Sequence, residues 1–147
     1  MRRAFTLLEL LIVISIVGIL TLVAVPRLQQ ASSATKLRSA KREVSALLTQ
    51  ARASAIQNGR STSFVRNGNQ LSVIIDNDAG PQIVLRRDLS TAYGATLTSS
   101  RDTVPFDPRG LIAGNSSTIV VGVQIGESRD SVCVIALGKI VTQGCAL

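Results

Sequence analysis

The chain has 147 residues, of which 46% are hydrophobic, and it carries a formal net charge of +7 without a single histidine. Because histidine is the commonest general base and metal ligand in proteins, its absence argues against most acid–base and metal chemistry. The sequence also contains no nucleophile-elbow, phosphate-loop or dinucleotide-binding glycine motif. The composition therefore predicts a protein that is not an enzyme and that uses no cofactor and no metal.

Residues 5–25 form an apolar stretch in which Glu9 is the only ionisable side chain. An α-helix of this length spans roughly 30 Å, the thickness of the hydrocarbon core of a bilayer. We therefore expect this stretch to be the membrane-spanning half of a helix. Arg2 and Arg3 precede it, which places the rest of the chain across the membrane from the cytoplasm. A secretory signal peptide and a generic anchor are alternatives, but the apolar run is longer than a signal-peptide core.

The segment at residues 3–9, Arg-Ala-Phe-Thr-Leu-Leu-Glu, resembles the class III signal of type IV pilins and of the pseudopilins of type II secretion. In that family a prepilin peptidase cuts before the phenylalanine and methylates the new amine. The resemblance implies a leader peptide of residues 1–4, cleavage between Ala4 and Phe5, N-methylation of Phe5, and a role in assembly for Glu9. The family usually has glycine before the cut, where this chain has Ala4.

The resemblance also gives Glu9 a physical role. A carboxylate at the centre of a bilayer costs about 2.5 to 3.5 kcal/mol. In a filament, the amine of Phe5 on one subunit and Glu9 of its neighbour would satisfy each other's charge in a medium of low dielectric constant. The implied partners are therefore other pilins or pseudopilins, the prepilin peptidase and the inner membrane. The implied location is a single pass through the inner membrane with a periplasmic globular part, followed by incorporation into a pilus or pseudopilus.

An amphipathic half of the helix is expected over residues 26–58, where apolar side chains recur at spacings of three, four and seven. Asn58 and Gly59 provide a stop signal. The expected apolar face consists of Leu37, Val44, Leu48, Ala51 and Ala55, widened by Leu47 and Ile56. The basic residues off this face are either a solvated surface or a contact for anionic lipid or a partner. They are Lys36, Arg38, Lys41, Arg42 and Arg52.

Residues 59–147 show a strand-like pattern and are expected to form one β-rich globular part. Turn signals at residues 67–69 and 77–81 indicate a meander of three strands, and residues 105–110 indicate a structured loop. We therefore predict an α+β, pilin-like fold in which a long N-terminal helix packs on an antiparallel β-sheet. The expected strands cover residues 61–66, 70–76, 82–87, 95–99, 117–125, 131–137 and 139–143.

Cys133 and Cys145 are the only cysteines, and export from the cytoplasm makes a disulfide between them the expected state. A hairpin turned by Gly138-Lys139-Ile140 would place the two cysteines directly opposite each other, at a separation that a disulfide can bridge. Zinc is the poorer alternative, because two cysteines without histidine supply only half of a structural site.

The Phe-Asp-Pro-Arg-Gly-Leu segment at residues 106–111, the apolar strand after it and the Gly-Lys turn resemble the GspH/FimT branch of minor pilins and pseudopilins. This resemblance implies a low-abundance structural subunit that helps to initiate or cap a type IV pilus. The alternatives are a GspH-type pseudopilin of type II secretion and a pilus-tip subunit that binds DNA during DNA uptake.

Among DNA-binding members of that branch the turn resembles Gly-Arg-x-Arg, and here it reads Gly138-Lys139-Ile140-Val141. The resemblance thus makes Lys139, together with Arg109, the candidate DNA contact. Phosphate contacts need clustered cations, and single strands also need aromatic side chains on which bases stack. The chain has no Trp, one Tyr and three Phe, so DNA is the least favoured of the expected partners.

Overall fold

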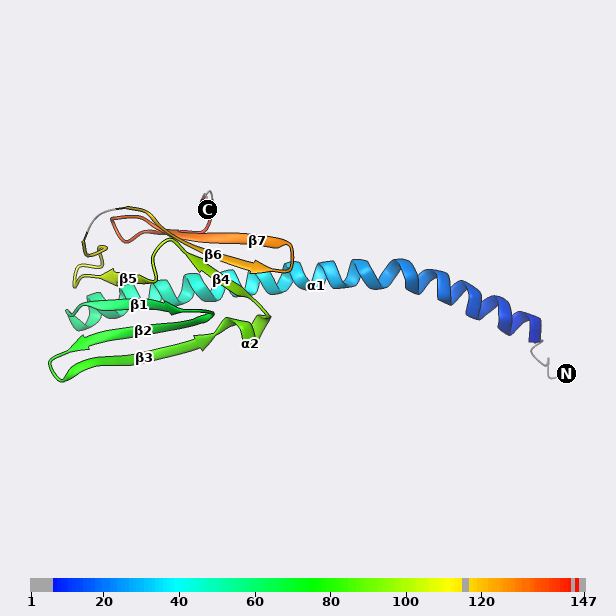
Figure 1. Ribbon diagram of the computed structural model, residues 1–147, viewed down its shortest axis with the longest axis horizontal. Coiled ribbons are helices and arrows are strands. Elements are labelled where there is room, and N and C mark those ends of the chain that lie inside the picture. The colour runs from blue at the N-terminus through cyan, green and yellow to red at the C-terminus, as the bar shows by residue number, and fades with distance from the viewer. Residues whose placement is uncertain (1–6, 115–116, 144, 146–147) are drawn as a thin grey trace. The chain divides into compact units, whose positions relative to one another are not determined.

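The structure is a computed structural model that describes residues 7–114, 117–143 and 145. The chain divides into two compact units, Met1–Ala34 and Thr35–Leu147. Figure 1 labels the helices and every strand except the last one. In chain order the elements are α1 (Leu7–Asn58), β1 (Thr62–Asn67), β2 (Gln70–Asn77), β3 (Gly80–Asp88), α2 (Leu89–Tyr93), β4 (Thr96–Ser99), β5 (Thr103–Phe106), β6 (Ile119–Ile125), β7 (Ser128–Val134) and β8 (Ile140–Val141).

In the first unit the described residues form the beginning of α1, and their large apolar side chains are exposed, from Leu7 to Leu28. A helix that is apolar on every side is typical of a membrane span. Two hydroxyl groups in this stretch donate to carbonyl oxygens one turn earlier, Ser15 to Leu11 at 2.8 Å and Thr21 to Val17. Lipid therefore meets no unsatisfied hydroxyl donor at these positions. By length and composition, α1 is a candidate transmembrane helix.

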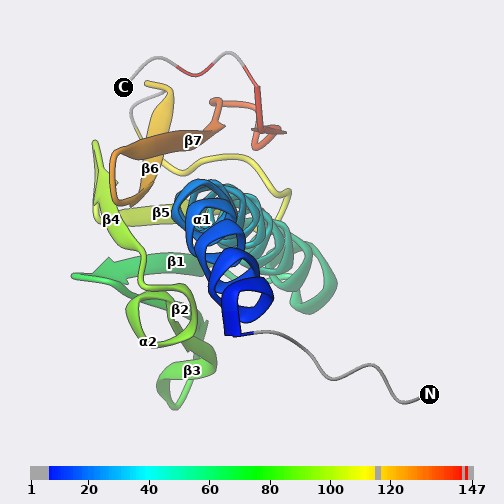
Figure 2. The same cartoon turned by 90° about the vertical axis from the view of Figure 1, so that its right-hand side faces the viewer.

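The second unit combines the remainder of α1 with two antiparallel sheets of four strands each. The first sheet has the strand order β3-β2-β1-β5, and the second has the order β4-β6-β7-β8. Figure 2, which looks nearly along α1, shows the strands arranged round one side of the helix. The predicted α+β class, with a helix packed on antiparallel sheet, is confirmed, although the strands form two sheets where one was predicted.

The core of this unit forms where the apolar face of α1 meets both sheets. Each of the five residues predicted for that face is buried, and so are Ala40 and Leu47. The widening by Ile56 is wrong, because this side chain is 50% exposed and packs at the rim beside Gly110. The sheets contribute both buried phenylalanines of the core and further fully buried side chains. These residues are Phe64 on β1, Leu71 and Val73 on β2, Val104 and Phe106 on β5, Val121 and Val123 on β6, and Val132 on β7.

The predicted meander is confirmed as β1, β2 and β3. Asn67 pairs with Gln70 across a two-residue turn of Gly68 and Asn69, the tightest kind of hairpin connection. The next hairpin pairs Asn77 with Gly80. Each turn falls where the Asn and Gly residues of the sequence indicate it, because these residues accept the backbone conformations that tight turns require.

Two elements in the structure were not predicted from the sequence. The strand β5 contains Pro105, which favoured a loop, but β5 is at the edge of its sheet, where a missing backbone donor is tolerated. The short helix α2 is capped by Asp88, whose carboxylate accepts the backbone N–H groups of Ser90 and Thr91 at 2.9 and 3.1 Å. Gly94 ends this helix in the left-handed conformation at φ 68°.

The register predicted for the C-terminal hairpin is wrong. Cys133 pairs with Val141 rather than with Cys145, and Val134 pairs with Ile140. The turn lies further upstream than predicted, closed by a hydrogen bond of 2.8 Å from the N–H of Gly138 to the carbonyl of Ile135. Gly138 ends the turn at φ 72°, a conformation that a side chain disfavours, so its position fixes where the hairpin reverses.

We predict that Gly138→Ala will lower the free energy of unfolding by roughly 3 kcal/mol. A Cβ atom there would lie 1.9 Å from the carbonyl oxygen of Gly110, so a clash with backbone adds to the strain of the positive φ. The matched control is Gly126→Ala, at φ 59° with nothing within 4 Å of the added Cβ, which should cost only about 1 kcal/mol. Thermal unfolding of the full chain in detergent, followed by circular dichroism, measures both. Equal losses in the two variants would contradict the close contact.

Candidate functional site

The motif at the N-terminus is only partly within the described residues. Ala4 and Phe5, the expected cleavage junction, lie outside them. Glu9 lies in the first turn of α1 with an exposed side chain. A carboxylate in the first turn interacts favourably with the helix dipole. The structure therefore places Glu9 near the N-terminal end of the described part of α1.

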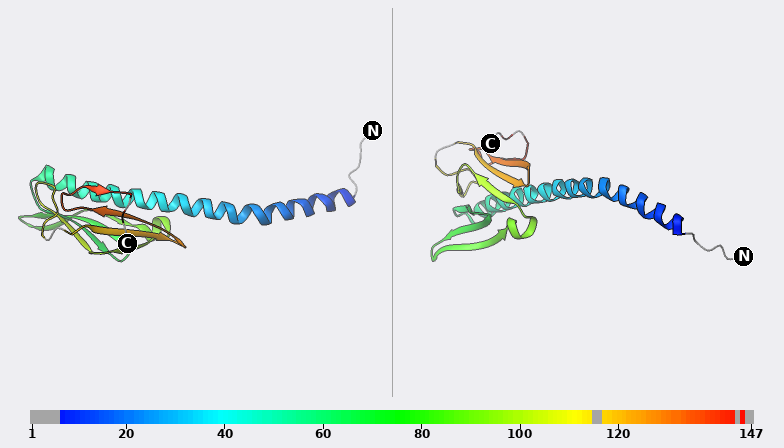
Figure 3. Two further views of the ribbon diagram at one scale, coloured as in Figure 1. Left: turned by 90° about the horizontal axis from the view of Figure 1, so that it is seen from above. Right: turned by 45° about the vertical axis from the view of Figure 1, so that its right-hand side comes forward.

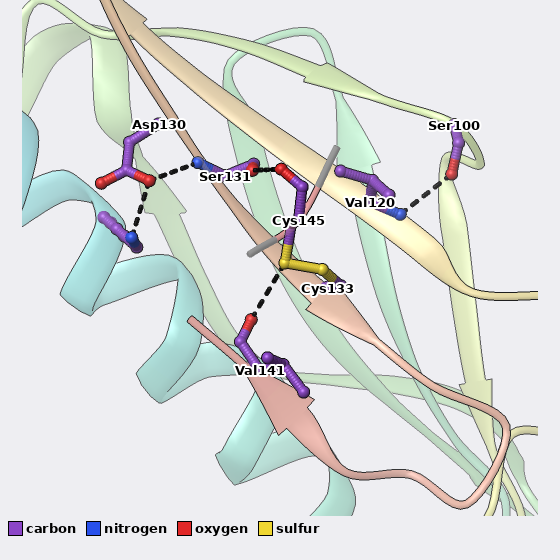
Figure 4. Close-up of a disulfide and its surroundings, with 8 residues drawn as sticks. Ser100, Val120, Asp130, Ser131, Cys133, Val141 and Cys145 are labelled. Carbon is purple, nitrogen blue, oxygen red and sulfur yellow. Dashed lines mark hydrogen bonds and ion pairs between the residues drawn. A yellow bond between two sulfur atoms is a disulfide. The ribbon is translucent and has the colours of Figure 1, made fainter. Parts of the chain in front are cut away.

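The predicted disulfide between Cys133 and Cys145 is confirmed, with 5.9 Å between the two Cα atoms. Figure 4 shows the bond joining β7 to the segment that follows β8. A second link lies beside it, because the hydroxyl of Ser131 donates to the carbonyl of Cys145 at 3.1 Å. In the chain-entropy picture a loop this small contributes roughly 3 kcal/mol of stability. The C-terminal segment is thus held against β7 in spite of the changed register.

The loop at residues 105–110 and the C-terminal turn, which the sequence singled out separately, lie against each other in the structure. Gly110 and Gly138 are both buried, and a Cβ atom at Gly138 would lie 1.9 Å from the carbonyl oxygen of Gly110. A Cβ atom at Gly110 would instead lie 2.7 Å from the side chain of Ile56. The N–H of Ile112 donates to the carbonyl of Ala136 at 3.1 Å, which ties the two segments together. Arg109 and Lys139, the candidate DNA contacts, each adjoin one of these glycines.

The side chain of Arg109 is already paired within its own loop. Its guanidinium donates to Asp107 at 2.8 and 3.0 Å, while the other carboxylate oxygen accepts the N–H groups of Arg109 and Leu111. The hydrogen bond from Leu111, followed by that from the Arg109 guanidinium, lowers the pKa of Asp107. The carboxylate therefore stays charged at neutral pH and offsets the positive charge that a phosphate would need.

Arg52 is a third cation at this place, and its position here was not predicted from the sequence. Its Nε atom is buried without a hydrogen-bond partner among the described residues, and it lies beside both Gly110 and Gly138. Lys139 is exposed and forms no ion pair with any residue that the structure describes. The helical spacing of Arg52 shows that it flanks the apolar face, but only the long-range contact between the two glycines brings the turn to it.

Four of the other ten basic side chains in the second unit form ion pairs with carboxylates. Within the described part of the chain Lys41 pairs with Asp130 at 2.6 Å and Arg87 with Glu43 at 3.4 Å. Arg60 and Arg66 also form ion pairs, with Asp78 and Asp102 respectively. A continuous stripe of unpaired cations, as phosphate binding along a nucleic acid would favour, is therefore not what these residues form.

Two family profiles match the chain. Residues 1–25 match the prokaryotic N-terminal methylation motif, and residues 40–138 match the family described as type II transport protein GspH. Two relatives, both named fimbrial protein and both from Pseudomonas aeruginosa, are 46% identical over 59 residues. That match covers 40% of this chain and 38% of each relative, so the chain spans less than half of the curated relatives it matches.

Among solved structures, the fold is similar to that of the type IV minor pilin FimU of Pseudomonas aeruginosa in two crystal forms. The first has a TM-score of 0.63 at 18% identity and covers 75% of this chain and 90% of FimU. The second has a TM-score of 0.60, also at 18% identity, and covers 74% of this chain and 93% of FimU. At this level of identity the likeness concerns the fold.

The GspH match extends from the buried half of α1 to the C-terminal turn, and the methylation motif matches residues 1–25, which include the apolar start of α1. These two matches, together with a helix packed on antiparallel sheets as in a pilin, establish the family. The chain belongs to the GspH/FimT family of type IV pilin-like proteins.

Proposed function

We propose that the chain is a minor pilin, a low-abundance structural subunit that helps to initiate or cap a type IV pilus. The observation that carries this proposal is the coincidence of a methylation motif on an apolar helix with a small globular unit of pilin-like fold. A subunit built in this way has an apolar helix that anchors it in the membrane before assembly. Its folded globular unit is available for contacts at the filament surface. Its contribution is structural, through contacts with other pilins or pseudopilins.

The alternative that this family leaves open is a pseudopilin of type II secretion, the system named in the description of the matching family. The fimbrial name of the two relatives and the minor pilin fold of FimU favour the pilus. Both machines would use the same cleavage, the same membrane helix and the same packing. The genes that neighbour this one distinguish them, since pilus and secretion components are encoded in separate sets.

In the proposed mechanism, the prepilin peptidase removes residues 1–4 and methylates the amine of Phe5. Before assembly the chain lies in the inner membrane, with its leader in the cytoplasm and its globular unit in the periplasm. In the filament, the amine of Phe5 on one subunit meets the carboxylate of Glu9 on a neighbour. Removing one member of such a buried pair costs about 3 to 5 kcal/mol, which makes the pair a criterion for incorporation.

We predict that the mature chain begins at Phe5, because Ala4 is the smallest substitute for the usual glycine before the cut. Removal of the leader eliminates Arg2 and Arg3 and leaves 14 Lys and Arg against 9 Asp and Glu, a net charge of +5. Mass spectrometry of protein extracted from membranes measures the N-terminus. Ala4→Gly should be cleaved at least as fast and Ala4→Leu more slowly. Retention of both arginines in membranes that contain active peptidase would sink the proposed processing.

We predict that Glu9→Gln will leave cleavage intact and reduce the amount of the chain in sheared filaments by more than about tenfold. The reason is that breaking a buried ion pair by removing one partner costs about 3 to 5 kcal/mol. Ser15→Ala is the matched control in the same helix, because its hydroxyl donates to the carbonyl of Leu11, one turn earlier. Immunoblots of the filament and membrane fractions measure the distribution. Equal incorporation of Glu9→Gln and the unmodified chain would remove the role assigned to Glu9.

A second candidate function is DNA binding at the pilus tip, and the contact between Gly110 and Gly138 is the observation that favours it. This contact gathers the segments of Arg109 and Lys139 beside Arg52. Three features weigh against tight binding. Arg109 is paired with Asp107, the second cation of the DNA-uptake pattern is Val141 here, and the chain has few aromatic residues.

We predict that the full chain in detergent binds duplex DNA only weakly, above micromolar dissociation constants at physiological salt. Lys139→Ala should weaken that binding about equally for all sequences and lower the salt slope by roughly one. Arg101→Ala, which changes an exposed cation far from the C-terminal turn in sequence, is the control. Fluorescence anisotropy over a range of salt concentrations measures these values. Submicromolar affinity that is lost in Lys139→Ala would instead make DNA binding the leading function.

A further inference from the structure

A groove of about 780 Å³ lies along the face of α1 that the two sheets leave uncovered. Its other wall is formed by Asp130 at the start of β7 and by Thr142 and Gln143 after β8. Thr142 and Gln143 directly follow β8, the short orange-red strand that is seen in front of the cyan part of α1 in the left view of Figure 3. Pockets of 300 to 1,000 Å³ are the usual size for binding sites. The groove belongs entirely to the second compact unit and is separate from Gly110 and Gly138.

The floor of the groove is a run of small or uncharged side chains on consecutive turns of α1. Ala46 and Thr49 are exposed, and Ser45 and Ala53 are half-buried. From Arg38 to Ala53 the helix rises by roughly 22 Å, at about 1.5 Å per residue. That length accommodates an extended peptide of about six residues, at roughly 3.3 Å each.

The positive charge of the groove is concentrated at one end. Arg38, Lys41 and Arg42 line that end, and Lys41 is paired with Asp130 at 2.6 Å. Arg38 and Arg42 are exposed and form no ion pair with any residue in the described part of the chain. Among the described residues, Asp130 is the one carboxylate that lines the groove, and it is already paired with Lys41, so a carboxylate of a bound partner would complement these two arginines.

The uncharged part of the groove is suited to the backbone of an extended peptide. Thr49, Gln50, Thr142 and Gln143 line it with hydroxyl and amide groups, which both donate and accept hydrogen bonds. An extended segment has unpaired backbone N–H and C=O groups that need such partners. The wall that carries Thr142 and Gln143 is held by the disulfide at Cys145, so the groove exists before the peptide arrives.

We propose that this groove binds an extended acidic segment of a neighbouring filament subunit, with an aspartate or glutamate seated between Arg38 and Arg42. The inference rests on the proposed function, because it takes the partner from the same filament. A nucleic acid fits less well, since the cations occupy one end only and the groove has no aromatic side chain. An anionic lipid headgroup would use the two arginines but leave the polar floor and wall without partners.

The test places the photo-cross-linking residue p-benzoylphenylalanine at Gln50 of the full chain, expressed in cells that assemble filaments. Gln82, an exposed glutamine on β3, is the matched control position. After irradiation, the chain is purified and its adducts are identified by mass spectrometry. The expected adduct at Gln50 is a peptide of a pilin subunit with Asp or Glu within about five residues of the cross-link. The same peptide should be at least about tenfold less abundant at Gln82.

Charge-reversal variants test whether Arg38 and Arg42 bind the carboxylate of the partner. Arg38→Glu with Arg42→Glu should lower the yield of the adduct by at least about tenfold, whereas Arg86→Glu with Arg101→Glu, at exposed positions outside the groove, should change it by less than about twofold. Replacing the acidic residue of the captured segment with Lys should restore the adduct in the variant that carries Arg38→Glu and Arg42→Glu, because the charges are again opposite. Formation of the Cys133–Cys145 disulfide reports folding, and the milder pair Arg38→Gln with Arg42→Gln replaces any variant that fails to form it.

Several outcomes would overturn the inference. They are an adduct at Gln50 no stronger than at Gln82, an adduct with lipid or nucleic acid alone, a captured pilin peptide without an acidic residue, and a yield unaffected by the Arg38 and Arg42 changes. The filament fraction separates this result from the proposed function. If the chain is present in filaments and no acidic segment is captured, the groove inference alone is wrong. If an acidic pilin segment is captured but the chain is absent from filaments, the inference about the groove is upheld and the proposed function is wrong.

Discussion

Burial of one face of α1 in the second compact unit is the interaction on which the rest of that unit depends. Val44, Leu47 and Leu48 are almost completely buried, and each such side chain contributes roughly 1.5 to 3 kcal/mol relative to exposure. The alanines on the same face, Ala51 and Ala55 among them, have small side chains, so that residues of both sheets can pack close to the helix backbone. The helix is therefore the element that joins two small sheets into one core.

The same constraint determines which surface is left for other molecules. Because the sheets cover one side of the helix, the residues on its remaining side, from Arg38 to Ala53, line the groove instead of the core. A surface on a long helix is rigid, and here the opposite wall is fixed by the disulfide and by the hydrogen bond from Ser131 to Cys145. Binding to a preformed surface loses less conformational entropy than binding that must order a loop.

What the sequence could predict is what depends on local chemistry. The apolar stripe of α1 follows from residue spacing, the turn at Gly68 from its turn residues, and the candidate membrane span from length and composition. The cysteine pair follows from there being only two cysteines. The hairpin register at Gly138 was predicted wrongly, because the sequence alone does not show whether a glycine begins or ends a turn. Gly138 ends the turn, and it also packs against Gly110, which is 28 residues earlier in the chain. Similarly, β5 is a strand in spite of Pro105 because it happens to be at a sheet edge. The place of Arg52 beside the C-terminal turn depends on the same distant contact.

In the proposed filament, the two compact units contribute differently to the recognition of neighbouring subunits. A pair between the amine of Phe5 and Glu9 selects for subunits that have been processed, but any processed pilin presents the same amine, so the pair does not distinguish one neighbour from another. Specificity must then come from side chains that differ between subunits, and these belong to the globular unit. An isolated charge on an exposed surface contributes at most about 1 kcal/mol. Two arginines at the end of a walled groove can discriminate better, because the wrong neighbour leaves both charges without a partner while its own side chains still cover them.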